Sequence, residues 1–302
     1  MILGTAESYS YSYPHSKQST LNVVSGDSIN SIFSKFSLNI AEKMLLKIFL
    51  LNNNIYLIQA GHYDISSMSW REILINLYQG NIKRFEFQIK EGSNIFALKD
   101  QLIASNLSLD CPEFTCLDKQ FGFIEGTLMP DTYFHNYQSP ASVILIKAQA
   151  LLFEYSKQLW AKKSTLNPLN SIQDALILAS IVEKEAGNNS EKPIIAGVFL
   201  HRLKLKMKLQ ADPTIIYGLL PDFNGNITKQ NLKDSSNRFN TYQIKGLPPT
   251  PISIISKSSI EAVILGQPNE YLFFVAKGDG THYFSTEYSD HLKAVKNYQL
   301  KQ

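Results

Sequence analysis

The sequence predicts an α+β protein with a small N-terminal module and a larger mixed domain. A strand, a glycine turn and a helix follow one another twice, in residues 23–36 and again in residues 88–102. Several apolar stretches have helical spacing, and a segment near the C-terminus has the alternation and Asp-Gly turn of a β-hairpin. We expect a flexible leader over residues 1–20, a module over 21–88 and the larger domain over 89–302.

The composition limits the number of domains and the kinds of function that the chain can have. The chain has 302 residues, 44% of them hydrophobic, which is enough for one large domain or two unequal ones. Its 29 Lys and Arg residues are scattered against 26 Asp and Glu, and the densest basic patch, His201–Lys208, is short. We therefore expect no nucleic-acid partner. Cys111 and Cys116 have no second pair for a four-ligand zinc site, and the sequence leaves open whether they form a disulfide.

The leader is rich in Ser and Tyr and shows no period. It has neither a basic start nor a long apolar core, so it is not expected to be a signal peptide or a membrane anchor. The most apolar stretch, residues 44–54, is interrupted by Lys47 and is too short to cross a bilayer. We expect the chain as given to be soluble.

The two strand–turn–helix units share one plan. Aligning Gly26 with Gly92 places apolar residues on one helical face in both units. Between the units, Ser69 and Glu72 form a capping box, which predicts a helix that ends at Gly80. Its predicted buried stripe consists of Ile73, Leu74, Leu77 and Tyr78.

The larger domain opens with a long predicted helix, with Ser139 as its N-cap and Pro140 at its first position. A second helix carries the run "LILASIVEKEAGNN" (residues 176–189), and a third is entered at Pro193. The segment "YLFFVAKGDGTHYFS" predicts a hairpin that turns at Asp279-Gly280, and a closing helix begins near Glu287.

Two glutamates end the second of these helices. At roughly 100° per residue, Glu185 falls in the middle of the apolar stripe of Leu178 and Val182, whereas Glu183 falls nearer Ser180. Burial disfavours a charged carboxylate and raises its pKa, as a general acid at neutral pH requires. The alternatives are that Glu185 reaches solvent as the helix ends, or that it pairs with a buried Arg such as Arg202.

Three irregular segments carry polar and aromatic side chains of the kind that grip sugar hydroxyls and rings. These candidate substrate-binding residues are Glu125, Asp131, Gln210, Asp212, Tyr217, Asn240 and Tyr242.

Several motifs resemble those of the MltG-type (YceG-like) endolytic murein transglycosylases. The stretch from Leu178 to Leu219 is similar to the most diagnostic part of that family. The segments "EGTLMPDTY", "FNTYQIKGLPPTPIS" and "LFFVAKGDGTHYFSTEYSDH" resemble further family signatures, in the right order. The similarity runs from about residue 21 to the C-terminus.

The resemblance implies a LysM-like module before a YceG-like catalytic domain. It implies an enzyme that cuts nascent peptidoglycan strands internally, between MurNAc and GlcNAc, and leaves 1,6-anhydro-MurNAc ends, so terminating glycan elongation. The catalytic residue would be Glu185, the second Glu of the EKE motif, and the helical wheel selects the same residue.

The family works in the bacterial cell envelope, with the catalytic domain outside the cytoplasmic membrane, and usually carries a membrane helix that this sequence lacks. Peptidoglycan synthases (penicillin-binding proteins) are the implied partners, and no cofactor is implied.

Other functions remain open at this point. A wall-binding scaffold would keep the module and the cleft without the chemistry. A hydrolytic muramidase would use Glu185 with Asp131 or Asp212 as its partner. A metalloenzyme is disfavoured because the six His residues show no HExxH spacing. If the lytic mechanism holds, Glu185→Gln should abolish cleavage and Glu183→Gln should retain much of it.

Overall fold

A computed structural model of the chain describes residues 2–15, 18–223 and 225–299. It is mixed α+β, as the sequence predicted, and divides into two compact units. The N-terminal unit comprises Met1–Phe87 with Phe134–Ser139, and the C-terminal unit comprises Gln88–Tyr133 with Pro140–Gln302. No helix within the described residues is both long and apolar enough to cross a membrane.

The N-terminal unit is built around one apolar core. Its helices and strands are, in order, α1 (Ile2–Ser10), β1 (Thr20–Val23), α2 (Ile29–Ser34), α3 (Ile40–Asn52), β2 (Gly61–Asp64) and α4 (Trp70–Gln79). Strands β1 and β2 pair antiparallel. Trp70 is fully buried and meets the rings of Phe33 and Phe36 edge-on, at centroid distances of 6.1 and 4.8 Å.

The expectation of a flexible leader is wrong for residues 2–10, which form α1 and pack against α3. Ala6 and Ser10 are buried there, and the Glu7 carboxylate pairs with Arg71. A nine-residue helix is marginal by itself, so these tertiary contacts stabilise it, and no periodicity in the leader revealed them.

Helix α4 follows the sequence prediction closely. Ser69 and Glu72 form the predicted capping box, and Gly80 ends the helix in the left-handed conformation, with φ of 71°. Tyr78 is the exception, because it is 46% exposed, and Trp70 takes its place in the buried stripe.

The C-terminal unit holds most of the helices. Strands β3 (Phe85–Ile89) and β4 (Asp131–His135) pair with each other, and the boundary between the two units runs through both strands. The other elements are α5 (Ile95–Ile103), η1 (Pro112–Phe114), α6 (Ala141–Trp160), α7 (Ile172–Glu185), α8 (Lys192–Lys204), α9 (Asp212–Gly218), α10 (Lys229–Lys233), α11 (Lys257–Ile264), β5 (Phe273–Ala276), β6 (His282–Ser285) and α12 (Tyr288–Tyr298). Cys111 and Cys116 form a disulfide, which answers the question that the sequence left open.

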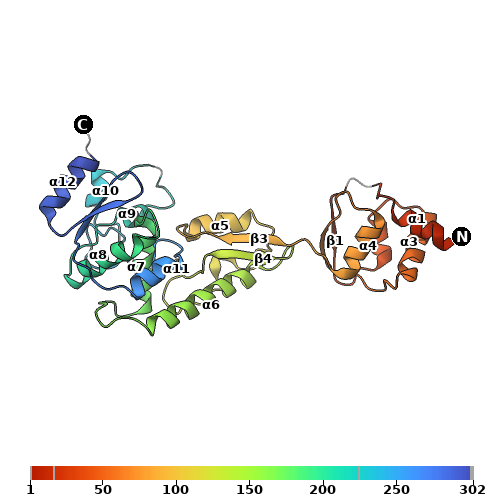
Figure 1. Cartoon of the computed structure of the whole chain (residues 1–302), viewed down its shortest axis with the longest axis horizontal. Helices are drawn as coiled ribbons and strands as arrows, with labels where there is room; N and C mark the ends of the chain where they lie inside the picture. The colour runs from red at the N-terminus through yellow and green to blue at the C-terminus, as the bar shows by residue number, and fades with distance from the viewer. Residues whose placement is uncertain (1, 16–17, 224, 300–302) are drawn as a thin grey trace. The chain divides into compact units, whose positions relative to one another are not determined.

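Helix α7 lies at the centre of this unit, against α8 and α11 (Figure 1). Ser171 caps its first turn by accepting a hydrogen bond from the backbone N–H of Asp174 at 3.0 Å. Every residue from Ala175 to Val182 is buried, so the helix is fixed on all sides until its last turn. This surrounding core holds the end of α7, and the residues that follow it, in place.

The remaining boundaries agree with the sequence except at one helix. Pro193 lies in the first turn of α8, and β5 and β6 form the predicted antiparallel hairpin, followed by α12. Helix α6 begins at Ala141 with Pro140 at its N-cap position. Ser139 does not cap α6, because its hydroxyl instead accepts a hydrogen bond from the backbone N–H of Asn136.

Candidate active site

A cavity of about 500 Å³ opens at the C-terminal end of α7. One part of its wall is polar and comes from α7, α8 and the segment that enters α9. The other part is largely aromatic and comes from the β5–β6 hairpin and α12. The residues that line it are Glu185, Arg202, Leu209, Gln210, Asp212, Tyr242, Phe273, Phe274, Val275, Ala276, His282, Tyr288, His291, Val295 and Gln299.

Glu185 is the last residue of α7, and its partly exposed side chain lines the cavity. Among the described residues, its carboxyl group has no hydrogen-bond or ion-pair partner. Arg202, the pairing partner considered from sequence, lies in the same cavity wall. Its guanidinium group instead donates to the backbone carbonyls of Leu272 and Leu209, both at 2.7 Å. The carboxyl of Glu185 is therefore available to a molecule in the cavity.

The surroundings of Glu185 favour its protonated form. Burial raises its pKa from an ordinary 4.5 to about 8, the negative charge of Asp212 adds to this rise, and Arg202 opposes it. The position at the C-terminus of α7 acts in the same direction, because that end of a helix carries partial negative charge. With a pKa of about 8, the group holds at neutral pH a proton that it can donate.

Three predicted binding residues join Glu185 in the cavity wall: Gln210, Asp212 and Tyr242. The Tyr242 hydroxyl donates to Asp212 Oδ1 at 2.7 Å, which orients both side chains. The backbone of Gln210 is left-handed, with φ of 53°, and its N–H donates to the carbonyl of Thr241 at 3.2 Å. The segment before α9 and the segment around Tyr242 are therefore joined, and they present polar atoms to one side of Glu185.

Glu125 and Tyr217, which we also predicted to bind substrate, do not line this cavity. Glu125 is buried and accepts hydrogen bonds from the backbone N–H of Ile95 at 2.9 Å and from the hydroxyl of Tyr217 at 3.0 Å. Burial raises the pKa of Glu125 to about 7. Through these two hydrogen bonds, Glu125 connects Ile95 in the first turn of α5 with Tyr217 in α9, so the pair has a structural role inside the unit.

Asn240 and Asp131 do not line this cavity either. Asn240 is completely buried, and its amide donates to the carbonyls of Asn231 and Asp234 at 3.0 and 2.8 Å. It thus holds the end of α10 instead of reaching the cavity. Asp131 is an exposed residue at the start of β4, beside a separate depression that includes Lys90 and Pro130. The segment around Tyr242 thus reaches the cavity, whereas the side chain of Asn240 in the same segment does not.

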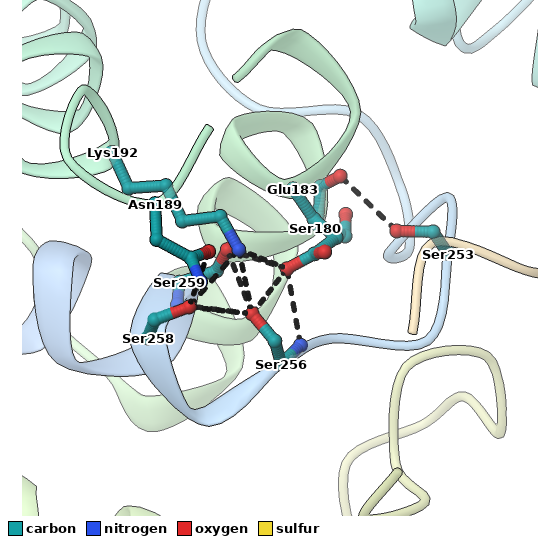
Figure 2. Close-up of polar contacts among 8 residues, drawn as sticks. All are labelled: Ser180, Glu183, Asn189, Lys192, Ser253, Ser256, Ser258 and Ser259. Atoms are coloured by element: carbon teal, nitrogen blue, oxygen red, sulfur yellow. Dashed lines mark hydrogen bonds and ion pairs between the residues drawn. The ribbon is translucent and has the colours of Figure 1, made fainter. Parts of the chain in front are cut away.

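Glu183, two residues before Glu185, differs from it because its carboxylate is surrounded by polar partners (Figure 2). Its Oε2 pairs with Lys192 Nζ at 3.2 Å, with side chains that are 6% and 4% exposed. The same oxygen accepts hydrogen bonds from the hydroxyls of Ser256 and Ser259, at the positive end of α11. Burial would raise the pKa of Glu183, but these hydrogen bonds and the charge of Lys192 outweigh it and hold the pKa below its ordinary value.

Sequence reasoning missed the aromatic wall and two of its histidines, His282 and His291. The motif "GDGTHYFSTEYSDH" was visible as a hairpin and a helix, but no pattern in it indicated which side chains face α7. Phe273 illustrates the packing, because its ring stacks on His291 at 5.4 Å and lies under the guanidinium of Arg202 at 5.5 Å.

Comparison with known sequences decides the family. Residues 21–297 match the sequence profile of the YceG-like family. The chain belongs to the YceG-like family. The family recognised from the sequence motifs is therefore confirmed.

Two relatives and one solved structure of this family resemble the chain. A protein of Bacillus subtilis (strain 168) named endolytic murein transglycosylase is 28% identical over 305 residues, which cover 92% of this chain and 84% of that protein. A protein of the same name from Streptococcus pneumoniae (strain D39) is 30% identical over 178 residues, 57% of this chain and 32% of its own length. A crystal structure of a YceG-like protein from Listeria monocytogenes, 26% identical, superposes with a TM-score of 0.62 over 91% of this chain and 97% of that one.

The environment of Glu183 changes one expectation for this YceG-like chain. Glu183→Gln removes one charge of a buried ion pair and leaves Lys192 without its counter-charge, so it should not be a neutral substitution. We expect a loss of about 3–5 kcal/mol in the free energy of unfolding, measured by urea denaturation at pH 7.

Glu154→Gln is the matched control, because Glu154 is exposed on α6 and bonds only to Gln158 among the described residues. It should change stability by less than about 0.5 kcal/mol. If the two variants unfold at the same urea concentration, the Glu183–Lys192 pair does not stabilise the unit as described.

Proposed function

We propose that the chain is an endolytic murein transglycosylase, as its relatives are named, and that Glu185 is its catalytic residue. The substrate is a nascent peptidoglycan glycan strand, cut between MurNAc and GlcNAc. The product carries a 1,6-anhydro-MurNAc end, and the cut terminates elongation of that strand. One observation carries this proposal: a carboxyl group with a pKa of about 8 faces a cavity and has no partner among the described residues.

A single carboxyl group suffices for this reaction. Ordinary glycosidases need an acid and also a second carboxylate that acts as nucleophile or base. In the transglycosylase reaction the nucleophile is the 6-hydroxyl of the same muramyl residue, so no water has to be activated. This matches a cavity in which Glu185 is the group placed to donate a proton.

The proposed reaction has two steps. Glu185 donates its proton to the glycosidic oxygen as the bond from C1 to that oxygen breaks. The 6-hydroxyl oxygen then bonds to C1, and the Glu185 carboxylate accepts the hydroxyl proton, which restores the starting form. Gln210, Asp212 and Tyr242 would hold the muramyl unit through hydrogen bonds, since these three share the cavity with Glu185.

The aromatic wall supports a sugar as the ligand. Phe273 and Tyr288 line the cavity and supply aromatic surface of the kind that packs against the C–H faces of pyranose rings. Polar groups on one side and aromatic groups on the other are typical of sites that bind such amphipathic molecules.

We place the protein in the cell envelope, with this cavity outside the cytoplasmic membrane. The substrate is found there, and the Cys111–Cys116 disulfide is of the kind that persists in oxidising compartments. The N-terminal unit, with two strands and helices packed on a common core, would act as the LysM-like wall-binding module. Penicillin-binding proteins, which synthesise the strands, are the proposed partners.

The proton donor can be tested by substitution. Glu185→Gln keeps the size of the side chain but removes the transferable proton, so digestion of uncrosslinked glycan strands should fall by at least about 100-fold. Mass spectrometry of the wild-type digest should show anhydro ends. Ends that are heavier by one water, about 18 Da, would indicate a hydrolase that uses Glu185 with Asp212 instead. Binding of strands without any cleavage by the wild type would indicate a scaffold.

The charge of Asp212 should contribute to the alkaline limit of activity, after the larger effect of burial. Glu185 works as an acid only while it is protonated, so activity should fall as the pH rises through about 8. Asp212→Asn removes a negative charge that raises the pKa of Glu185, and the alkaline limb of kcat/KM, which reports the free enzyme, should therefore move to lower pH.

Tyr242→Phe provides the comparison, because it removes the hydrogen bond to Asp212 and leaves the charge in place. Its alkaline limb should stay near that of the wild type. An unchanged limb in Asp212→Asn would show that Asp212 does not act on Glu185 electrostatically.

A further inference from the structure

One buried acidic residue meets the cavity wall in a way that the proposed mechanism does not use. Glu191 occupies the N-cap position of α8 without capping the helix through its side chain, and the residue is 9% exposed. Its Oε1 accepts the backbone N–H of His282 at 2.9 Å, and its Oε2 lies 2.8 Å from His282 Nδ1. The side chains of His282 and Glu191 are 10% and 11% exposed, so both are about nine-tenths buried. The carboxylate thus holds both the backbone and the ring of a residue that lines the cavity.

The hairpin that carries His282 is fixed to the segment immediately after Glu185. The side-chain amide of Asn188 donates to the carbonyl of Gly280 at 3.0 Å. Gly187 approaches that carbonyl so closely that an added Cβ would lie 2.6 Å from its oxygen. These contacts set the turn of the hairpin against the end of α7, so the segments that carry Glu185 and His282 adjoin each other in the cavity wall.

The ring of His282 can take only one useful orientation. It meets Phe274 edge-on at 5.4 Å and lies 6.2 Å from Phe284. Because a carboxylate can only accept, Nδ1 carries the hydrogen that points at Glu191. In the neutral ring the lone pair is then on Nε2, which has no partner among the residues described in the structure.

In this tautomer His282 offers Nε2 to the cavity as a hydrogen-bond acceptor. Glu185 holds its own proton for the leaving oxygen, and Asp212 Oδ1 already accepts from Tyr242. The attacking hydroxyl of the sugar must be oriented before it can close onto C1, and misplacement by about 1 Å can cost roughly 100-fold in rate. A fixed acceptor is the group that such a hydroxyl needs.

We propose that His282, oriented by Glu191, contacts the substrate, and that its Nε2 accepts a hydrogen bond from the muramyl 6-hydroxyl. This inference rests on the proposed function. The hydrogen bond turns the hydroxyl oxygen toward C1. The proton still passes to the Glu185 carboxylate as the O6–C1 bond forms, so His282 ends the cycle in the form in which it began, and Glu191 is a positioning residue.

Two substitutions separate this role from a structural one. His282→Asn places an amide nitrogen near the position of Nδ1, so it can still donate to Glu191, but it has nothing at the position of Nε2. Tyr283→Ala is the control, because Tyr283 is exposed on the same strand and does not line the cavity. Each purified full chain digests uncrosslinked glycan strands, and mass spectrometry gives the ratio of anhydro ends to hydrolysed ends.

We expect His282→Asn to unfold at the wild-type temperature and to cleave roughly 10-fold to 100-fold more slowly. Its share of hydrolysed ends should rise, because water competes when the 6-hydroxyl is no longer oriented. Tyr283→Ala should match the wild type in both respects. A wild-type product ratio in His282→Asn, at any rate of cleavage, would overturn the proposal.

If His282→Asn does not fold, Glu191→Gln takes its place, since its amide oxygen can still accept the backbone N–H of His282 while the ring is released. The same shift toward hydrolysed ends is expected, and an unchanged ratio counts against the proposal. Failure of the proposed function is distinguishable, because the wild type itself would then release no anhydro ends.

Discussion

The chemistry of this protein depends on the desolvation of one carboxyl group at the C-terminal end of a buried helix. Three features of the fold act together on Glu185: burial, the negative charge of Asp212, and the negative end of α7. Each favours the neutral acid, and Arg202 is the opposing influence. Because the guanidinium of Arg202 is held by two backbone carbonyls, it tempers the effect without forming an ion pair with Glu185.

The same helix end holds a second carboxylate in the opposite state. Glu183 meets Lys192 and the positive end of α11, and its hydrogen bonds keep it ionised although it is buried. Two residues apart, one glutamate fastens α7 to α8 and α11, and the other is left free to react. The ion pair thus fixes the helix end that presents Glu185, and the docked hairpin fixes the segment that follows it.

Features of the fold that depend on residues close together in the sequence could be predicted from the sequence. The capping box of Ser69 and the left-handed Gly80 bounded α4 correctly, and the 3.6-residue period placed Glu183 and Glu185 on different sides of α7. Local signals failed where a partner distant in sequence decides the outcome. Helix α1 forms because α3 covers it, which no pattern in the leader reveals.

The site shows the same division. Gln210, Asp212 and Tyr242 were found because polar residues on irregular backbone often line clefts, but that signal also selected Asn240, whose amide holds buried carbonyls. His282 was missed because its partner, Glu191, lies 91 residues away, and only the fold brings the two together. A family motif therefore locates the segments that form a site, whereas the direction in which each side chain points depends on tertiary contacts.

The most direct test of the central claim is the titration of Glu185 itself. In protein labelled with ¹³C at glutamate Cδ, the signal that Glu185→Gln removes should titrate near pH 8 and should report the neutral acid at pH 7. A midpoint near 4.5, the ordinary value for this group, would show an ionised carboxylate at neutral pH and would contradict the account.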